Sequence, residues 1–233
     1  ATVKRYQSVV GALLYCATNT RPDGAYAVGM LCRAMGKPTL EMENAALRVL
    51  RYLYRTRTLG LRFEASPRPL HGFSDSAWAV QHSTSGWVFL LNSASVAWGS
   101  KKQKTVALSS CEAEIMAGSE AAKEAVHLSR LATELGMHDD GLVDLLMDNR
   151  SAIDVAYNPE HHGRMKHVAR RHLFIRELGE DHKIRVPFVR TDDNLADFFT
   201  KPLRASIFFP MRDKIMNVAG SEDVRVRRAG RAG

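Results

Sequence analysis

Four acidic side chains that lie far apart in the sequence stand where strands are expected to end or helices to begin: Asp75, Glu114, Asp148 and Asp197. In an α/β fold, sites form outside the carboxyl ends of strands, so acids at such places can converge. Converging carboxylates repel one another unless cations hold them together, and hard divalent ions such as Mg²⁺ prefer that oxygen-rich environment. A pair of metal ions can serve both the attacking and the leaving oxygen of a phosphodiester. The four acids therefore suggest metal-dependent phosphodiester chemistry.

The elements expected around these acids support their placement. Asp75 follows a short apolar segment, and Asp148 ends the apolar run 142–147, whose length suits a buried strand. Glu114 falls in the first turns of a helix, and Asp197 opens an amphipathic stretch after a Thr-Asp-Asp-Asn turn. With 25 Asp and Glu in 233 residues, however, some suggestive placements are inevitable, since most such side chains are solvated or cap helices. Spacing alone therefore leaves the site a weak hypothesis.

Seven blocks of sequence either contain one of these acids or lie between two of them. They read GFSDSAWA at 72–79, STSGWVF at 83–89, WGSKKQ at 98–103, ALSSCEAE at 107–114, DNRSAI at 148–153, KH at 166–167 with FIRE at 174–177, and ADFFTKPL at 196–203. In this order they closely resemble the ribonuclease H region in the C-terminal part of copia-type retrotransposon Pol polyproteins. The resemblance runs from about Tyr6 to about Val218. One block can match by chance, whereas seven in the same order are a strong signal.

The first 60 residues resemble the segment that joins the reverse transcriptase to its ribonuclease H in that family, through YQSVVGALLY at 6–15 and TRPD at 20–23. The paired-aspartate motif of the polymerase, Tyr-x-Asp-Asp, is absent, so DNA synthesis by this chain alone is not expected. Two prolines in the stretch 66–69 favour an extended connection. We therefore predict a helical connection segment at 1–66, a ribonuclease H-like domain at 67–220 and a disordered basic tail at 221–233.

Apolar periodicity predicts the elements that must position the acids. Apolar residues recur at helical spacing at 9–17 and again at 42–53, after a Pro-Thr start signal. The later elements are expected as strands at 70–74, 87–91 and 96–98, a long helix that stops at Gly136, a strand ending at 147, helices at 151–157 and 168–179, a strand at 184–189 and a final helix from about 194. The predicted fold class is α/β, with a ribonuclease H-like mixed five-stranded sheet flanked by helices and an N-terminal helical extension.

Two neighbouring glutamates compete for one metal-binding position. Ser109-x-x-Glu112 has the spacing of a capping box, which gives Glu112 a sufficient structural reason at the helix start. In the ribonuclease H family the catalytic glutamate is typically followed three residues later by a small residue on the same helix face, and Glu114 with Ala117 fits. We therefore favour Glu114 as the catalytic acid and keep Glu112 as an acid at the edge of the site.

Positive charge supports a polyanionic partner. The formal net charge is +8 with a pI near 9.6, and residues 161–176 hold five Lys or Arg, four His and no acid. Such a run either forms a solvated helix face or holds a nucleic-acid backbone by an attraction that weakens with salt. The predicted nucleic-acid contacts are Arg164, Lys166, His167, Arg170 and Arg171, with Lys101, Lys102, Lys104 and Asn149 as further candidates. Ser83, Thr84 and Ser85 either donate hydrogen bonds to phosphate or ribose or form a turn.

Cysteine and hydropathy patterns exclude several other classes. The three cysteines have no metal-ligand spacing, which indicates a reducing compartment and argues against a disulfide framework or a zinc site. No apolar run of about 18 residues occurs and the N-terminus lacks a signal-peptide pattern, so no membrane association is expected. The resemblance implies an intracellular location in a cytoplasmic retrotransposon particle, with the nucleus as the alternative. The oligomeric state is not predicted.

The sequence departs from the family pattern at several positions. Ala77 replaces a second aspartate that commonly follows the first acid, and Ile115 replaces the tyrosine after the Glu-Ala-Glu triplet. Cys111 stands where threonine is expected, and Ala169 stands where an aspartate commonly follows Lys-His-Ile. The loop 191–194 holds no counterpart of the histidine that many ribonucleases H carry before the last aspartate. None of these changes removes one of the four acids.

The resemblance implies an endonuclease that hydrolyses the RNA strand of RNA:DNA hybrids during reverse transcription, by a two-metal-ion mechanism. The expected cofactors are two Mg²⁺ ions, for which Mn²⁺ can substitute, with Asp75, Glu114, Asp148 and Asp197 as catalytic and metal-binding residues. The expected partners are the hybrid and the reverse transcriptase domain of the same polyprotein. The alternative hypothesis is a catalytically inactive nucleic-acid-binding remnant, which the departures from the family pattern favour.

Overall fold

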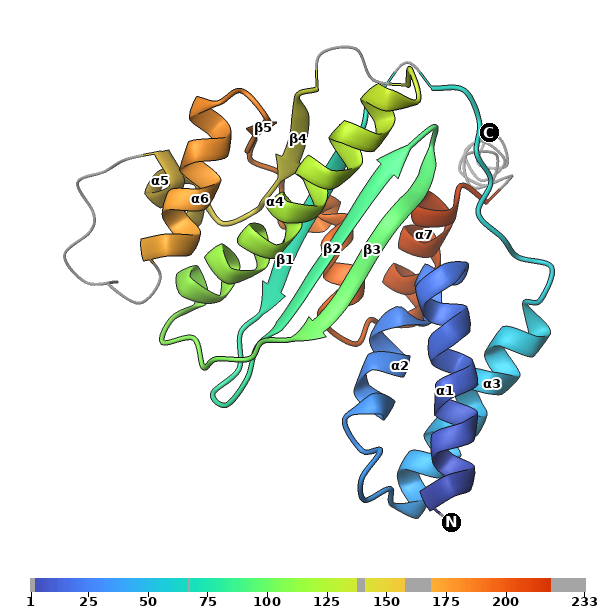
Figure 1. The fold of residues 1–233 in the computed structure, drawn as a ribbon. Helices are drawn as coiled ribbons and strands as arrows, with labels where there is room; N and C mark the ends of the chain where they lie inside the picture. Colours follow the sequence, from blue (N-terminus) through green and yellow to red (C-terminus); the bar gives the residue numbers. More distant parts are fainter. Residues whose placement is uncertain (1–2, 67, 138–140, 158–168, 219–233) are drawn as a thin grey trace, which may run out of the picture. The chain divides into compact units, whose positions relative to one another are not determined.

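The computed structural model describes residues 3–66, 68–137, 141–157 and 169–218 of the 233-residue chain. The chain divides into two compact units. Among the described residues, one unit contains the chain up to Ala65, the short segment Ser93–Ser95, which includes the first residues of a strand, and the chain from Pro202 on. The other contains Ser66–Asn92 and Val96–Lys201. The first unit is helical, and the second is built around a β-sheet (Figure 1).

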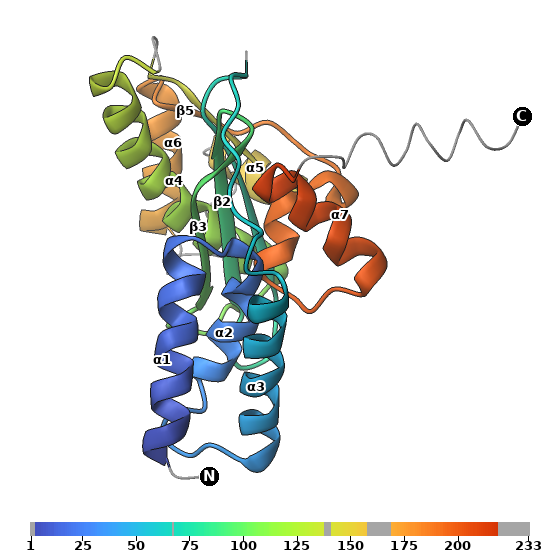
Figure 2. The same cartoon turned by 90° about the vertical axis from the view of Figure 1, so that its right-hand side faces the viewer.

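The helical unit consists of α1 (Val3–Asn19), α2 (Ala25–Cys32), α3 (Leu40–Arg55) and α7 (Ala205–Met216). In Figure 2 the first three of these helices lie side by side. Residues at helical spacing form their common core, which includes Tyr6, Val10, Leu13, Ala46 and Leu53. Thr39 caps the start of α3, because its hydroxyl oxygen accepts a hydrogen bond from the Met42 amide. The predicted N-terminal helices are therefore present.

The second unit contains a five-stranded sheet in the order β3-β2-β1-β4-β5. Its strands are β1 (His71–Ala77), β2 (Thr84–Leu91), β3 (Ala94–Lys102), β4 (Val143–Leu146) and β5 (Ile184–Arg185). β1 pairs antiparallel with β2 and parallel with β4, and β4 pairs parallel with β5. Antiparallel strands can be joined by tight turns, whereas parallel strands need longer crossovers. The predicted mixed five-stranded sheet is confirmed.

Helices supply the crossovers between the parallel strands. α4 (Ser110–Glu134) leads from β3 to β4, and α5 (Arg150–Tyr157) and α6 (Ala169–Glu180) lie between β4 and β5 in the sequence. Figure 2 shows α4 and α6 together on one side of the strands. Ala121 and Ala125 of α4 are fully buried in the core that includes Leu145. Gly136 follows the helix with a φ of 68°, the left-handed conformation that ends helices, as the sequence predicted.

The C-terminal part of the chain differs from its prediction. The final helix expected from about residue 194 is two elements, the 3₁₀ helix η4 (Leu195–Phe199) and α7. Pro202 accounts for the break, because the residue before a proline avoids the α conformation. α7 also belongs to the helical unit, whereas the sequence analysis placed it in the ribonuclease H-like domain. The domain limits at 1–66, 67–220 and 221–233 stay a prediction.

The predicted basic tail, residues 221–233, lies outside the described residues. Within the part of the chain that the structure describes, no helix combines the length and the hydropathy that a membrane span requires.

Candidate functional site

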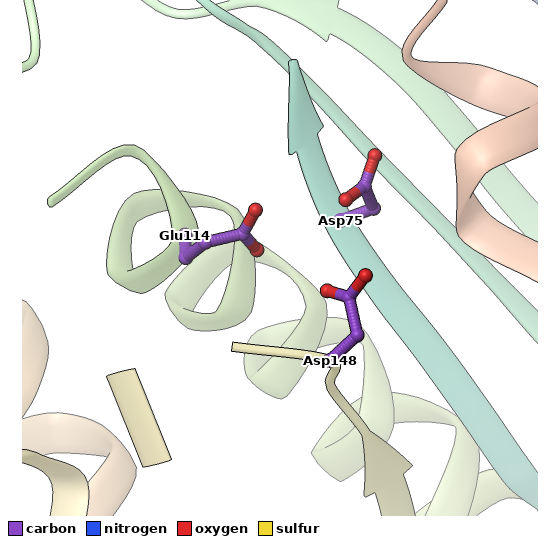
Figure 3. A group of neighbouring side chains, drawn as sticks. All are labelled: Asp75, Glu114 and Asp148. Atoms are coloured by element: carbon purple, nitrogen blue, oxygen red, sulfur yellow. The ribbon is translucent and has the colours of Figure 1, made fainter. Parts of the chain in front are cut away.

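Three of the four predicted acids meet at one point of the second unit. Asp75 lies on β1, Glu114 near the start of α4 and Asp148 just after β4, and Figure 3 shows their side chains turned toward one another. Each offers a carboxylate oxygen, and these oxygens all lie within 4.8 Å of one another. Asp75 and Glu114 are buried, with exposed fractions of 5% and 6%, and Asp148 is half-buried. Such a group of oxygens suits a divalent cation.

The sheet register explains why these acids meet. Parallel pairing places Phe73 opposite Leu146. Asp75 and Asp148, each two residues further on, therefore lie at the same end of the two strands. Neighbouring strands lie only about 4.8 Å apart, which brings the two side chains into reach of each other. α4 begins beside the same edge, and Glu114 in its second turn completes the group.

Hydrogen bonds fix the two buried carboxylates. Glu114 Oε1 accepts hydrogen bonds from the Ser76 amide at 3.2 Å and from the Ser76 hydroxyl at 3.0 Å. Glu114 Oε2 is buried and has no hydrogen-bond partner among the described residues. Asp75 Oδ2 accepts a hydrogen bond from the Thr200 hydroxyl. A buried carboxylate oxygen without a donor costs free energy, and a cation between the acids would remove that cost. The residues present therefore fit a divalent metal ion.

Burial and mutual repulsion disfavour the charged forms of both buried acids. Burial raises the pKa of Asp75 to about 7; the Thr200 hydrogen bond opposes this shift, and the charges of Asp197 and Asp148 add to it. Burial likewise raises the pKa of Glu114 to about 9, and the charges of Asp75 and Asp148 again add to the shift. A bound divalent cation favours the ionised carboxylates, so it would reverse these shifts.

Asp197 approaches the same acids from η4. A 3₁₀ helix has three residues per turn, so Asn194, Asp197 and Thr200 share one face. Asn194 is fully buried and ties this face to β1, because its Nδ2 donates a hydrogen bond to a backbone carbonyl oxygen of that strand at 3.0 Å. Asp197 Oδ1 pairs with Lys201 Nζ at 2.7 Å. Asp197 therefore stands beside Asp75, outside the group of three acids.

Sequence reasoning missed three side chains that hold the acids in place, namely Ser76, Asn194 and Thr200. The spacing Asn-x-x-Asp-x-x-Thr carries the signal for the last two. Residues at this spacing are eclipsed on a 3₁₀ helix, whereas the sequence predicted an ordinary helix there. Ser76 has no distinguishing sequence signal, because its role depends on a contact with a residue 38 positions away.

The two neighbouring glutamates point to different places. Glu114 joins the group of acids, whereas Glu112 serves the helix start. The Glu112 amide donates to Ser109 Oγ at 3.1 Å, and Glu112 Oε2 accepts from the Leu108 amide at 2.7 Å. The carboxylate thus binds the amide one residue before the cap, a variant of the predicted capping box. The catalytic roles of the four acids stay predictions.

The hydroxyl segment Ser83-Thr84-Ser85 is buried, with exposed fractions of 0%, 6% and 3%. Thr84 and Ser85 lie in β2, so the turn alternative is wrong for them. Ser83 Oγ accepts a hydrogen bond from the Ala79 amide at 3.2 Å, and Ser85 Oγ accepts one from Gln103 Nε2 at 2.9 Å. These bonds connect the start of β2 to Ala79, which follows β1, and to Gln103, which follows β3. The predicted contacts of these hydroxyl groups with phosphate or ribose stay predictions.

The remaining predicted nucleic-acid contacts fall into three groups. Lys101, Lys102 and Lys104 are exposed at the end of β3 and just after it. Asn149 Oδ1 accepts a hydrogen bond from the Ala152 amide at 3.0 Å, so this side chain caps α5. α6 contains Arg170 and the half-buried Arg171, whereas Arg164, Lys166 and His167 lie outside the described residues. All these contacts stay predictions.

Comparison with known proteins places the chain among retrotransposon proteins, although no protein-family model matches it. The chain is 39% identical over 200 residues to the Retrovirus-related Pol polyprotein from transposon TNT 1-94 of Nicotiana tabacum, a match that covers 84% of this chain and 15% of that protein. It is also 50% identical over 129 residues to the secreted RxLR effector protein 161 of Plasmopara viticola, covering 53% of this chain and 91% of that protein. The chain thus spans about 15% of the length of its Pol relative.

Among solved structures, the foamy viral protease-reverse transcriptase in complex with RNA/DNA hybrid matches 87% of this chain and 26% of that chain, with a TM-score of 0.55 at 14% identity. Such a low identity shows the fold alone. Together with the strand order, it confirms the predicted ribonuclease H-like fold of the second unit. The chain belongs to the Pol polyprotein family of copia-type retrotransposons, as its motifs predicted.

Proposed function

We propose that this chain hydrolyses the RNA strand of RNA:DNA hybrids during retrotransposon reverse transcription. The observation that carries the proposal is the convergence of Asp75, Glu114 and Asp148, whose oxygens lie within 4.8 Å of one another. The foamy viral protein with the same fold was solved as a complex with an RNA/DNA hybrid, which supports the choice of substrate. The Pol relative supports the setting, since its name describes a retrovirus-related polyprotein.

The proposed cofactors are two Mg²⁺ ions, for which Mn²⁺ can substitute. Asp75, Glu114 and Asp148 would hold them, together with Asp197. When bound, such ions lower the pKa of an attacking water and offset the charge that develops on the leaving 3′ oxygen. The chemistry then needs no nucleophile from the protein, and we propose none.

The side chains around the acids would contribute orientation. Ser76 holds Glu114 through two hydrogen bonds, and the Thr200 hydroxyl holds Asp75. Asn194 is itself fixed by two hydrogen bonds at the start of η4, which keeps Asp197 near the same edge of the sheet. Carboxylates that are already held in place need little rearrangement when cations and substrate bind.

The choice of RNA would rest on contacts with 2′-hydroxyl groups and on the shape of the hybrid, because an A-like helix displays these groups in a wide minor groove. The exposed side chains of Lys101, Lys102 and Lys104 would contact phosphates. The proposed protein partner is the reverse transcriptase domain of the same polyprotein. The proposed place of action is a cytoplasmic retrotransposon particle, with the nucleus as the alternative.

Cleavage of a labelled hybrid with and without divalent ions tests this function. With Mg²⁺ the chain should cut the RNA strand and leave the DNA strand intact, and excess EDTA should stop the reaction. A DNA duplex of the same sequence is the matched control and should stay intact. Binding of the hybrid without cleavage in either Mg²⁺ or Mn²⁺ would contradict the proposal and favour the inactive remnant.

A further inference from the structure

Four large apolar side chains are exposed on two loops of the sheet-containing unit. Trp78 and Val80 follow β1 and are 50% and 83% exposed, and Val106 and Leu108 precede α4 and are 46% and 80% exposed. We call these four residues the Trp78 patch. Single exposed apolar residues are common, but a group of them on neighbouring loops marks an interaction surface.

The two loops of the Trp78 patch are held against each other. The Trp78 indole N–H donates a hydrogen bond to the Ala107 carbonyl oxygen at 3.2 Å, which joins the first loop to the middle of the second. Ala107 itself is buried in a small core with Ala113 and Met116 of α4. The exposed side chains therefore stand on a supported surface, and binding to a rigid surface has a smaller entropic cost than binding to a mobile one.

The Trp78 patch borders the group of acids on both loops. On the first loop, Trp78 follows Asp75 by three residues, and the intervening Ser76 binds Glu114 through its amide and hydroxyl. On the second loop, the Leu108 amide binds Glu112, two residues before Glu114. The two loops that carry the patch are therefore directly continuous with residues that hold the acids or stand beside them.

Positive charge lies beside the same patch. Lys101, Lys102 and Lys104 are exposed on the segment that leads from β3 into the second loop. Lys101 Nζ lies 4.9 Å from the centre of the Trp87 ring, so this lysine packs on an aromatic face. An aromatic ring and aliphatic side chains flanked by cations match the backbone of a nucleic-acid duplex, whose sugars have apolar faces and whose phosphates are anionic.

We propose that the Trp78 patch is a binding subsite for the RNA:DNA hybrid, in which the indole of Trp78 lies against a sugar of the backbone and the three lysines bind phosphates. The inference rests on the proposed function and names a contact surface for its substrate. Trp78 binds substrate in this proposal and takes no part in the bond cleavage. Its loss should therefore weaken binding and leave the rate at saturating hybrid nearly unchanged.

Equilibrium binding of a fluorescent hybrid to the full chain in EDTA tests the subsite without cleavage. Trp78→Ala should weaken binding about tenfold, since removing an aromatic side chain from an apolar contact costs about that much. Trp78→Phe keeps an aromatic face but loses one ring and the indole N–H that bonds Ala107, so it should bind within about threefold of wild type. Leu108→Ser, at a side chain too exposed to affect folding much, should weaken binding about threefold. Leu131→Ala is the control, at an exposed residue of α4 about 25 Å along the helix from Glu114.

The salt dependence separates the apolar contact from the ionic one. Trp78→Ala should leave the slope of log affinity against log salt unchanged, because the indole neutralises no phosphate. Lys101→Gln combined with Lys102→Gln should reduce that slope by about one for each lost phosphate contact. Wild-type affinity in both Trp78→Ala and Leu108→Ser would overturn the proposal. A Trp78→Ala variant that binds the hybrid with wild-type affinity but self-associates less than the wild type would also overturn the proposal. The patch would then be a contact between copies of the chain.

Cleavage by the wild-type chain distinguishes failure of the subsite from failure of the proposed function. If the wild type cuts hybrids with Mg²⁺ and Trp78→Ala binds them normally, only the subsite is wrong. If the wild type binds hybrids through Trp78 but never cuts them, only the proposed function is wrong.

Discussion

Two buried aspartates, one in each unit, show two different ways to bury a carboxylate. Asp23 of the helical unit is fully paired: Arg21 donates Nε–H to its Oδ1 at 2.9 Å and Nη2–H to its Oδ2 at 2.7 Å, and the Tyr52 hydroxyl donates to Oδ2 at 2.7 Å. Asp75 of the sheet-containing unit accepts a hydrogen bond from Thr200 but faces other carboxylates. One charge is neutralised inside the chain, and the other is surrounded by like charge.

The guanidinium that pairs with Asp23 is also satisfied by the chain. Arg21 donates hydrogen bonds to the Thr56 carbonyl oxygen at 3.1 Å and to the Thr56 hydroxyl at 2.6 Å. Its side chain is 8% exposed, and that of Asp23 is fully buried. A buried ion pair with every polar atom bonded fixes the geometry of the segments it joins. Here it ties Arg21 and Asp23, which lie between α1 and α2, to the end of α3.

The partners of a buried charge indicate its role. The Arg21 and Asp23 pair holds a structure together and needs nothing from outside. The acids around Asp75 leave Glu114 Oε2 without a donor among the described residues and raise each other's pKa, so their arrangement is stable only with protons or a cation. The pairing of Arg21 with Asp23 therefore has a structural explanation, and the unpaired oxygen among the acids of the second unit supports the proposal that these acids bind a cation.

The largest expected effect is the loss of hybrid cleavage in Asp148→Asn. The change removes a ligand charge at nearly constant shape, which should cost several kcal/mol of transition-state stabilisation, or a loss of at least about a hundredfold in rate. The measurement is single-turnover cleavage with Mg²⁺, and circular dichroism checks that the fold is intact. Retention of more than about a tenth of the wild-type rate, or less than about 1.4 kcal/mol lost, would sink the assignment.

The comparison itself is tested by the same substitution at its two aspartates. Asp23→Asn should lower the free energy of unfolding by about 3 to 5 kcal/mol, because it leaves the Arg21 charge buried without a partner. Asp75→Asn should raise it or leave it unchanged in EDTA, because it removes one of several like charges. Urea denaturation of both variants and the wild type gives the result. Equal destabilisation by the two substitutions would show that the two carboxylates are not held differently.

Stability in EDTA should fall as the pH rises from about 4 to about 9. The pKa values of Asp75 and Glu114 are raised from 3.8 and 4.5 to about 7 and about 9, so over this range the folded chain holds protons that the unfolded chain has released. Raising the pH then favours unfolding. Melting temperatures at several pH values check this, and saturating Mg²⁺ should reduce the loss. Asp75→Asn is the control and should flatten the pH dependence; a wild-type stability that rises over this range would contradict the prediction.

The smallest expected effect separates the two neighbouring glutamates. Glu112→Gln should cost about 1 kcal/mol of stability or less, because it weakens the bond to the Leu108 amide at the start of α4. Glu114→Gln should reduce cleavage strongly and change stability little in EDTA. Paired melting and cleavage assays measure both effects. The reverse pattern would mean that Glu112 is the ligand and Glu114 the structural residue.

Much of the fold can be predicted from the sequence, because the signals that start and end its helices and strands are local. The Pro-Thr start of α3, the cap at Ser109 and the stop at Gly136 each depend on residues within a turn of one another. Apolar periodicity likewise distinguishes the N-terminal helices from the later strands. The prediction of one helix from about residue 194 was wrong, because the apolar pattern there fits an α-helix as well as the 3₁₀ helix η4. Pro202 then separates η4 from α7.

The order of the elements and the four candidate acids can be predicted from the sequence, since helix caps, strand ends and motif blocks consist of consecutive residues. The partners that hold those acids depend on the tertiary structure. Thr200 meets Asp75 across 125 positions, and Asn194 meets Ser74 across 120. The tertiary structure also buries Ser85 against Gln103. Such contacts depend on how the sheet and helices pack, and no local pattern encodes that packing.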